Sequence, residues 1–516
     1  MLVDYEAPSP TCMLITSSWA IDFVIFFITI SYLVIKFYAR NNDFFKKRGV
    51  KYVKPKPIVG NVGRVMLLQE NTGNILKEIY DSTDAPYYGM FFFHVPYLVL
   101  KSPQLIKEVL VKEFGHFMNR TWAQAKHDEI QKNMMFFQHG EEWKLTRAKV
   151  SPVFTSGKLK GMFYILKDNG ELLVDFLRKN ADNVDLEKMT MRYVLNGISR
   201  CFFGINPHCL EDGVKSEFLD IIQEGSRPST LDALRMFCFL YHHKMVDFFK
   251  LNMFNKKMVD YCANTFNDVL KTREEARRSN NMRVNDMADI IIDLKYDEEF
   301  NKNFDFGGDK VLAQPFMFLL AGNGTTTMSL TFTLYELCIN PDVQSKLRDA
   351  INEMIDDYGG ITYEGLMDKK YSYIDMVLAE THRMYPAIFY LDRTCTSDFQ
   401  LPGTDYVVRK GEKIIIPTWA LHYDEKYFPD PYKFNPERFL KRVNEDGFYY
   451  VPFGEGPREC IGNRFALLNL KVALSSIIPN FSVEKTPQTP ARMKLDPVGL
   501  SAIPKGRLIV DFKPLT

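Results

Sequence analysis

Apolar residues recur every three to four positions through most of the chain, and this spacing predicts helices, for example over residues 102–113 and 158–178. A longer helix is expected over residues 308–340 and ends before Pro341. Another is expected over residues 373–384 and also ends near a proline. Helices of this length predict a mainly α fold.

A smaller part of the chain has the alternating or aromatic-rich pattern of strands. We expect strands at residues 89–94 and 97–100 around a turn at Val95 and Pro96, and short strands within residues 391–416. Residues 495–513 predict a hairpin with its turn at residues 504–506. The expected fold class is therefore mainly α with minor β.

The N-terminal region contains an apolar run with one charged residue, Asp22, within residues 12–35. About 20 such residues can cross a bilayer as a helix. No Lys or Arg precedes the run and eight follow it within residues 36–56, which places the remainder of the chain on the cytoplasmic side. The alternative is a cleaved signal peptide, but that needs basic residues where Asp4 and Glu6 stand.

We therefore expect four regions along the chain. These are a short lumenal N-terminus (1–11), a transmembrane anchor (12–38), a basic and Pro-rich linker (39–57) and a large domain (58–516). The charge asymmetry places this domain on the cytoplasmic face of the membrane.

Composition adds little to this picture. The 516 residues have a net charge of +1, which indicates no partner, and nothing leads us to expect nucleic-acid binding. The eight cysteines are scattered without a CxxC pair, so neither a disulfide framework nor a zinc site is predicted.

One of these cysteines, Cys460, has an unusual setting in the glycine-rich stretch 451–466. Arg458 precedes it by two residues, Gly462 follows it by two, and an apolar helix-like run comes next. A single sulfur ligand suits a metal that already has other ligands, such as haem iron, and an arginine can bind a carboxylate of the haem. The alternative is a buried structural cysteine beside a tight turn.

The pattern Phe453-x-x-Gly456-x-Arg458-x-Cys460-x-Gly462 closely resembles the haem loop of cytochromes P450. The resemblance extends from about Arg40 to the end of the chain. It implies a cytochrome P450 fold, with residues 58–516 as one catalytic domain behind an N-terminal transmembrane helix. It further implies localisation to the endoplasmic reticulum membrane, with the catalytic domain on its cytoplasmic face. It also implies haem b with Cys460 as the axial iron ligand.

Two further motifs resemble the family pattern around this loop. Glu380 and Arg383 stand one turn apart on a predicted helix, and the segment 434–439 contains Arg438. On their own they could form an ordinary surface ion pair. By resemblance they form a buried triad that supports the haem loop.

The segment 320–327 resembles the oxygen-activating helix of the family, with Thr325 at the position of the family threonine. Ala321 and Asn323 are the other candidate catalytic residues here. The sequence departs from the pattern at Gly324, where the family usually has an acid, so protons are expected to arrive through water, aided by Asn323 or Thr326. Glycines in this stretch could also distort the helix and make room beside the iron.

Haem-propionate contacts and the substrate pocket are inferred from position. The expected cofactor-binding residues are Arg120, Trp143, Arg147, Arg393, Phe453 and Arg458. The expected pocket residues are Phe137, Phe316, Leu320, Ile388, Phe389 and Leu500. Because the pocket set is apolar or aromatic, a lipophilic ligand is expected.

The resemblance implies a monooxygenase that inserts one atom of O2 into a lipophilic small molecule. Electrons come from NADPH through cytochrome P450 reductase, with cytochrome b5 as a second candidate donor. The closest likeness is to the group that contains vertebrate drug-metabolising and insect xenobiotic-metabolising members. Two alternatives stay open: a P450-fold hydroperoxide isomerase or dehydratase that needs no reductase, and a non-catalytic haem protein that binds small ligands.

Overall fold

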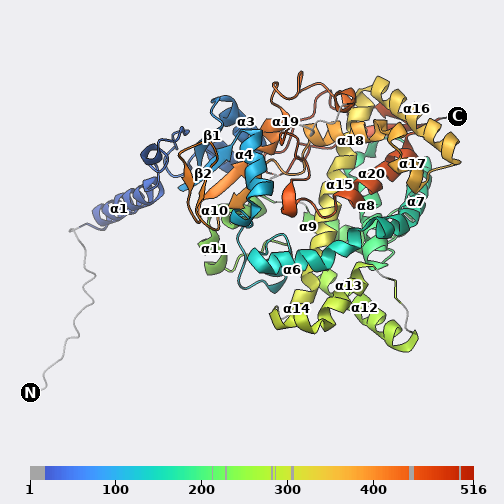
Figure 1. Cartoon of the computed structure of the whole chain (residues 1–516), viewed down its shortest axis with the longest axis horizontal. Helices are drawn as coiled ribbons and strands as arrows, with labels where there is room; N and C mark the ends of the chain where they lie inside the picture. Colours follow the sequence, from blue (N-terminus) through green and yellow to red (C-terminus); the bar gives the residue numbers. More distant parts are fainter. Residues whose placement is uncertain are drawn as a thin grey trace, which may run out of the picture.

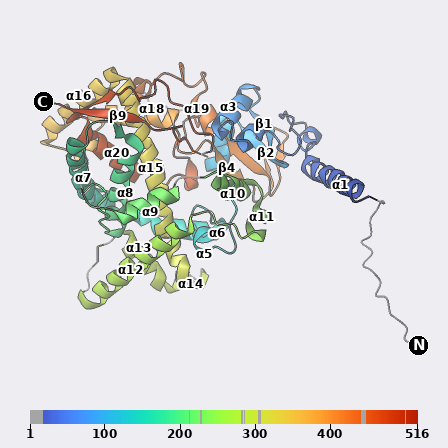
Figure 2. The same cartoon turned by 180° about the vertical axis from the view of Figure 1, so that it is seen from behind.

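The computed structural model describes residues 18–211, 213–226, 229–280, 283–284, 286–303, 307–440, 447–498 and 501–515. Residues 1–17, which include the expected lumenal segment and the start of the expected anchor, lie outside the described residues, as does Leu500 of the expected pocket. Figures 1 and 2 show a large helical body, a small β-rich part beside it, and helix α1 (Trp19–Ala39) standing apart from both.

The helical body is built mainly from long helices, as the sequence predicts. They are α7 (Ser156–Lys179), α8 (Leu186–Phe203), α12 (Lys256–Asn280), α15 (Ala313–Ile339), α16 (Pro341–Tyr358), α18 (Tyr373–Met384) and α20 (Asn463–Ile477). In α7 the buried residues Leu159, Met162, Phe163 and Leu166 follow the three-to-four spacing of one helix face. This stripe packs α7 against α20 and α8.

Shorter helices connect and cover these. They are α2 (Gly63–Met66), α3 (Thr72–Asp81), α4 (Pro103–Lys107), α5 (Glu129–Asn133), α6 (Gly140–Val150), α9 (Glu217–Ser226), α10 (Thr230–Tyr241), α11 (His243–Phe248), α13 (Met287–Tyr296), α14 (Glu298–Asn303), α17 (Tyr363–Met367) and α19 (Thr418–His422). Single turns of 3-10 or π-helix add η1 (Lys46–Arg48), η2 (Glu108–Lys112), η3 (Phe114–His116), η4 (Ser151–Phe154), η5 (Gly308–Leu312), η6 (Lys369–Tyr371), η7 (Pro436–Phe439) and η8 (Gly456–Arg458).

Helix α15 crosses the middle of the body and packs against α8, α18 and α20. Most of its side chains are buried, and the Thr331 hydroxyl lies 2.7 Å from that of Thr190 on α8. The helix is continuous from Ala313 to Ile339, so the expected distortion by glycine does not interrupt it. Ala321, Gly324 and Thr325 are exceptions. They form a stripe along α15 that is accessible to solvent although the helix lies inside the fold.

The sheets are small. The largest has the order β1-β2-β7-β4, with β1 (Tyr87–Phe92), β2 (Val95–Leu100), β4 (Leu391–Thr394) and β7 (Lys413–Ile416). Strands β2 and β7 are parallel and the other pairs are antiparallel. A second sheet joins β3 (Val184–Asp185), β9 (Ile509–Pro514) and β8 (Phe481–Lys485), and β5 (Phe399–Gln400) pairs with β6 (Val407–Val408). The prediction of short strands within 391–416 is thus confirmed.

Two predicted turns are wrong. The first hairpin turns at Phe93 and His94, not at Val95 and Pro96, because Phe93 takes the left-handed conformation (φ 56°) and Pro96 pairs with Phe91 inside the sheet. The expected C-terminal hairpin is shorter than predicted. Leu495 pairs with Pro504, so residues 504–506 do not form the turn, and β9 pairs with β8 and β3 instead.

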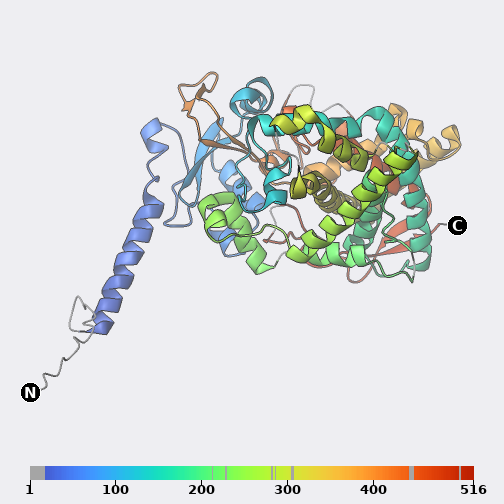
Figure 3. The ribbon, with the colours of Figure 1, turned by 90° about the horizontal axis from the view of Figure 1, so that it is seen from below.

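Helix α1 buries none of its residues and is long and apolar enough, by length and composition, to cross a membrane. Figure 3 shows it as a separate rod that reaches the β-rich part at its C-terminal end. There the rings of Phe37 and Tyr38 lie 5.2 and 5.3 Å from the ring of His94, which sits in the β1–β2 turn.

The residues that follow α1 pack onto the same sheet. Phe45 is 1% exposed and its ring fills the space above Gly89, where any Cβ would overlap it. Val50 is buried, and Tyr52 forms a bridge with Gly89. This half of the expected linker 39–57 is therefore held against the body.

Candidate active site

Cys460 lies at the end of a tight loop that leads into α20. Its backbone N–H donates to the carbonyl of Phe453 (2.8 Å), which closes the loop. Gly454 and Gly456 both have φ of +73°, a conformation that residues with a Cβ rarely adopt. Any Cβ on Gly456 would also overlap the carbonyl of Leu110 in η2, so this position requires glycine.

The thiol of Cys460 is exposed, yet burial is the main cause that raises its pKa. Both observations hold when a side chain faces an enclosed space inside the fold. The N–H of Gly462 and the guanidiniums of Arg147 and Arg120 act in the opposite direction and lower the pKa. The loop therefore supplies an N–H that favours a thiolate, and Arg147 and Arg120 from other segments supply positive charge that favours it as well.

A cavity of about 650 Å³ runs along the exposed stripe of α15. Gly324 and Thr325 line it, and the space beside Gly324 is open, since a Cβ there would meet nothing within 4 Å. Thr325 Oγ1 donates to the carbonyl of Ala321 (2.7 Å). Asn323 is buried and accepts a hydrogen bond from Thr327 (3.5 Å), so its side chain is directed within the helix rather than to the cavity.

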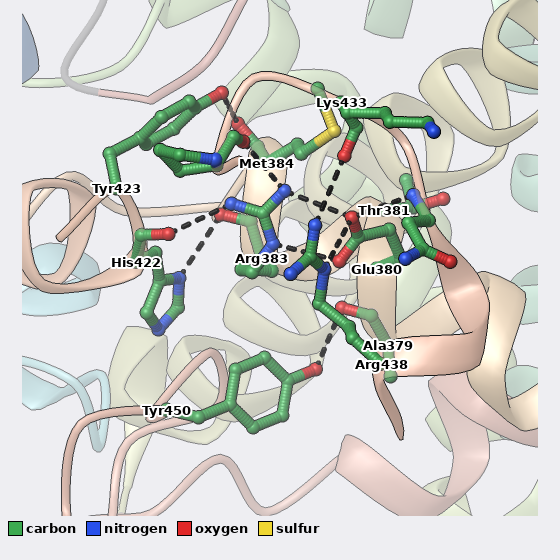
Figure 4. A network of polar contacts seen from close by, with 12 residues as sticks. Ala379, Glu380, Thr381, Arg383, Met384, His422, Tyr423, Lys433, Arg438 and Tyr450 are labelled. Carbon is green, nitrogen blue, oxygen red and sulfur yellow. Dashed lines mark hydrogen bonds and ion pairs between the residues drawn. The ribbon is translucent and has the colours of Figure 1, made fainter. Parts of the chain in front are cut away.

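Glu380, Arg383 and Arg438 meet in a buried ion network, which Figure 4 shows. Arg383 Nε lies 2.7 Å from Glu380 Oε2, and Arg438 Nε lies 3.0 Å from Glu380 Oε1. The N–H of Asn435 adds a third donor to the same carboxylate. The side chains of Glu380 and Arg383 are fully buried, so each charge depends on these partners.

The network reaches the cysteine loop through His422, a residue that sequence reasoning missed. Arg383 donates to the carbonyl of His422 (2.8 Å), and His422 Nδ1 lies 3.2 Å from the Arg383 carbonyl. The other ring nitrogen of His422 accepts from the N–H of Val451 (3.1 Å), where the loop begins. Tyr450, next to it, donates to the carbonyl of Ala379 (2.9 Å; Figure 4). These bonds hold the loop against α18.

Positive charge gathers on the opposite side of the loop. Arg120, Arg393 and Arg458 act on one another electrostatically, and burial lowers the pKa of Arg393 to about 10 and that of Arg458 to about 8. Asp392 is the carboxylate that opposes them. Within the described part of the chain, the Nε atoms of Arg120 and Arg393 are buried without a hydrogen-bond partner. An anionic group bound here would satisfy them.

The remaining predicted cofactor residues surround the same region. Arg458 donates to the carbonyls of Met118 (2.8 Å) and Gln138 (2.6 Å), and its guanidinium lies 4.3 Å from the ring centre of Trp143. Arg147 donates to the carbonyl of Glu459 (2.9 Å), next to the cysteine. The ring of Phe453 lies 5.0 Å from that of His382.

These residues fit a haem group. The cysteine supplies one axial ligand, the arginines with unsatisfied donors suit two propionates, and the open stripe of α15 leaves room on the other side. The family's acid is missing from this stripe, as the sequence indicates, because Gly324 carries no side chain.

The predicted pocket residues fall into two groups. Leu320 and Ile388 line the cavity. Phe137, Phe316 and Phe389 are at most 4% exposed and belong to the core; the ring of Phe316 lies 5.3 Å from that of Phe254, and the ring of Phe389 lies 5.2 Å from that of Trp419.

Ala387, Ala502 and Ile503 also line the cavity, in segments 387–390 and 500–503 whose positions suggest the pocket. Sequence reasoning missed other lining residues, which are Met191, Met328, Ser329, Phe332 and Tyr385, with Glu187, Asp496 and Arg507 among the charged residues of the same cavity. Those on α15 follow Thr325 at the spacing of one helix face, which is the signal that could have found them.

A cysteine loop, a cluster of buried arginines with unsatisfied donors and an open helix face beside a cavity define a haem-thiolate oxidoreductase. The family model described as Cytochrome P450 matches residues 50–510. Cytochrome P450 6j1 of Blattella germanica is 36% identical over 497 residues, which cover 94% of this chain and 96% of that protein. Human cytochrome P450 3A5 is 33% identical over 481 residues (92% and 93%), and probable cytochrome P450 6g2 of Drosophila melanogaster is 31% identical over 521 residues (95% and 99%).

The chain therefore belongs to the cytochrome P450 family. Its fold class is the one predicted, mainly α with minor β, and it is a haem monooxygenase whose cofactor is bound through a cysteine thiolate.

Proposed function

We propose that this monooxygenase oxidises lipophilic small molecules, xenobiotic or endogenous, with electrons from NADPH delivered by cytochrome P450 reductase. The observation that carries the proposal is the cavity along α15. Near Thr325 its wall is mostly apolar, with Leu320, Met328, Phe332 and Ile388, and such a wall favours a ligand that loses little hydration on binding. The charged residues Glu187, Asp496 and Arg507 also line the cavity.

Within this proposal, Cys460 would hold the haem iron through its thiolate, and Arg120, Trp143, Arg147, Arg393 and Arg458 would hold the propionates. Haem would supply the activation of dioxygen when it is bound. The protein's own part is to hold the substrate against the stripe of Ala321 and Thr325. The network of Arg438 with the fully buried Glu380 and Arg383 keeps the cysteine loop in place.

The location is part of the same proposal. Helix α1 anchors the protein in the endoplasmic reticulum membrane, with the body on the cytoplasmic face where the reductase is reached. The basic residues after α1 support this orientation. The basic residues Lys144, Lys149, Lys158 and Lys160 offer a docking face for the reductase, and cytochrome b5 is a second candidate donor.

The test is reconstitution of the full chain in lipid vesicles with reductase and NADPH. We expect NADPH-dependent oxidation of a panel of lipophilic probes, with one oxygen atom from O2 in each product. Fast rearrangement of a lipid hydroperoxide without reductase, and no NADPH-dependent product, would show the isomerase alternative. Ligand-induced spectral shifts without any product would show a binding protein.

Cys460→His tests the ligand directly. The reduced carbon-monoxide complex of the wild type is expected to show the long-wavelength Soret band of thiolate ligation, and the variant should lose it. Cys201→Ala, which removes a buried cysteine on α8, is the matched control and should keep the band. An unchanged band in Cys460→His contradicts the assignment.

A further inference from the structure

The imidazole of His382 contacts the hydroxyl of Ser329, a residue of the cavity wall. His382 lies on α18 between the two charged residues of the ion network, and it is 5% exposed. Its Nε2 is 3.1 Å from the hydroxyl oxygen of Ser329 on α15. Ser329 lines the cavity, one helical turn after Thr325. Burial lowers the pKa of His382 to about 4, so the ring is neutral near pH 7.

The distance from Ser329 to Thr325 matches a single bridging water. Side chains four residues apart on a helix are roughly 6 Å apart. Two consecutive hydrogen bonds through one water, each about 2.8 Å long, span about the same distance. The cavity of about 650 Å³ has room for such a water beside a ligand, since one water takes about 30 Å³.

The hydroxyl of Thr325 is suited to accept from that water. Its hydrogen is directed to the carbonyl of Ala321 (2.7 Å), which leaves its oxygen lone pairs for the cavity. Gly324, between these two residues, contributes no side chain that could compete. Thr327 also lines the cavity, but its hydroxyl donates to Asn323. Ser329 is therefore the next hydroxyl on the helix face of Thr325, and His382 determines how that hydroxyl is oriented.

A second titratable pair touches the cavity but lies farther away. Tyr385 lines the wall and donates to Glu336 (2.5 Å), whose pKa is raised by burial to about 7. Glu336 follows Thr325 by eleven residues, which is about 16 Å along a helix axis. A relay from there needs several waters, whereas Ser329 needs one.

We propose that Ser329 and His382 are positioning residues that hold a water against Thr325 and so deliver protons where Gly324 supplies no carboxyl. When His382 donates from Nε2 to Ser329, the hydroxyl hydrogen of Ser329 is free to point at the water. Solvent beside Glu187 and Asp496 supplies the protons at the far end of the cavity.

This inference rests on the proposed function. The overall reaction is RH + O2 + 2 e⁻ + 2 H⁺ → ROH + H2O, with both electrons from the reductase. The O–O bond breaks, one oxygen enters a C–H bond and the other leaves as water. If the second proton is misdirected, the same two electrons and two protons leave with O2 as hydrogen peroxide. The ratio of product to peroxide therefore reports proton positioning.

The experiment compares Ser329→Ala, His382→Leu and the double variant in the reconstituted system. We expect each to lower the ratio of product to peroxide about five-fold, the change that corresponds to one hydrogen bond of about 1 kcal/mol. The double variant should be no worse than either single one, because both remove the same interaction. His382→Gln, which keeps a side-chain donor, should recover most of the ratio.

Two further variants separate this role from a structural one. Thr331→Val removes a buried hydroxyl that faces α8 and should leave the ratio unchanged. Gly324→Asp places a carboxyl in the open space beside Thr325 and should restore the ratio in the Ser329→Ala background. Equal ratios in wild type and both single variants would overturn the inference.

Crystallography of the holoenzyme gives a readout that does not depend on turnover. A high-resolution structure should show a water within hydrogen-bond distance of both Thr325 and Ser329, and Ser329→Ala should lose it. No such water in the wild type overturns the inference even if turnover is normal. A wild type that binds this water yet never turns over contradicts the proposed function instead.

Discussion

The two glycines of the cysteine loop allow steric overlap to be separated from backbone strain. Gly454 and Gly456 share a φ of +73°, so alanine at either position costs about 1–2 kcal/mol for the left-handed conformation. At Gly454 the new Cβ would meet its nearest neighbour at 3.8 Å, so strain is the whole cost. At Gly456 it would overlap the Leu110 carbonyl, and overpacking adds about 1–3 kcal/mol or more.

We therefore expect Gly456→Ala to destabilise the protein by about 2–5 kcal/mol, against about 1–2 for Gly454→Ala. A total stability of about 5–15 kcal/mol makes the first loss severe and the second tolerable. The assay is the haem content per polypeptide after purification, together with thermal unfolding followed by circular dichroism. Gly359→Ala, with a φ of +67° and open space at a distant helix end, controls for strain alone.

The comparison has a clear refuting result. If Gly456→Ala retains as much haem and as high an unfolding midpoint as Gly454→Ala, the contact with η2 does not constrain the loop. The loop conformation would then depend on φ alone.

Three further predictions concern the buried polar groups. Glu380→Gln leaves two guanidiniums buried without a carboxylate and should cost about 3–5 kcal/mol of unfolding free energy in urea. Lys346→Gln breaks an exposed ion pair and should leave the unfolding free energy almost unchanged. His422→Phe removes the acceptor of the Val451 N–H and should speed haem loss to an apo-globin acceptor, with unfolding free energy lower by about 1–3 kcal/mol. Burial raises the pKa of Glu336 from 4.5 to about 7, so its contribution to stability is complete below pH 4.5. That contribution, about 3 kcal/mol, is lost as the pH rises through 7. Glu336→Gln should flatten this part of the Tm–pH curve, and parallel curves for wild type and variant would contradict the assignment.

Local sequence patterns identified the features whose chemistry is local. The spacing of glycines and Arg458 around Cys460 predicts a tight loop, and the structure shows one closed on Phe453. Glu380 and Arg383 are one turn apart on one helix, so their pairing was expected; the third partner, Arg438, came from the family resemblance. Long helices were predicted well because their apolar spacing extends over many turns.

Features that depend on partners far along the chain were not predictable. Strand β9 pairs with β8 and β3, and local turn residues do not reveal such partners. Asn323 was expected to assist catalysis, but helix rotation directs it to Thr327. The sequence indicates no role for His382, because its partner Ser329 is 53 residues earlier in the chain. An apolar residue such as Phe389 fits a core and a pocket equally well until the packing is known.

The packing of Phe45 against the sheet at Gly89 determines how many N-terminal residues can be removed without exposing the core. A version that begins at Asn41 loses the exposed apolar rod α1 but keeps Phe45 over Gly89, and it should express as a folded, less aggregating enzyme. A version that begins at Tyr52 removes the same rod and also uncovers the apolar surface around Phe91, so it should precipitate on expression. The practical boundary for crystallisation and solution assays is thus Asn41, sixteen residues before Pro57, the last proline of the basic segment.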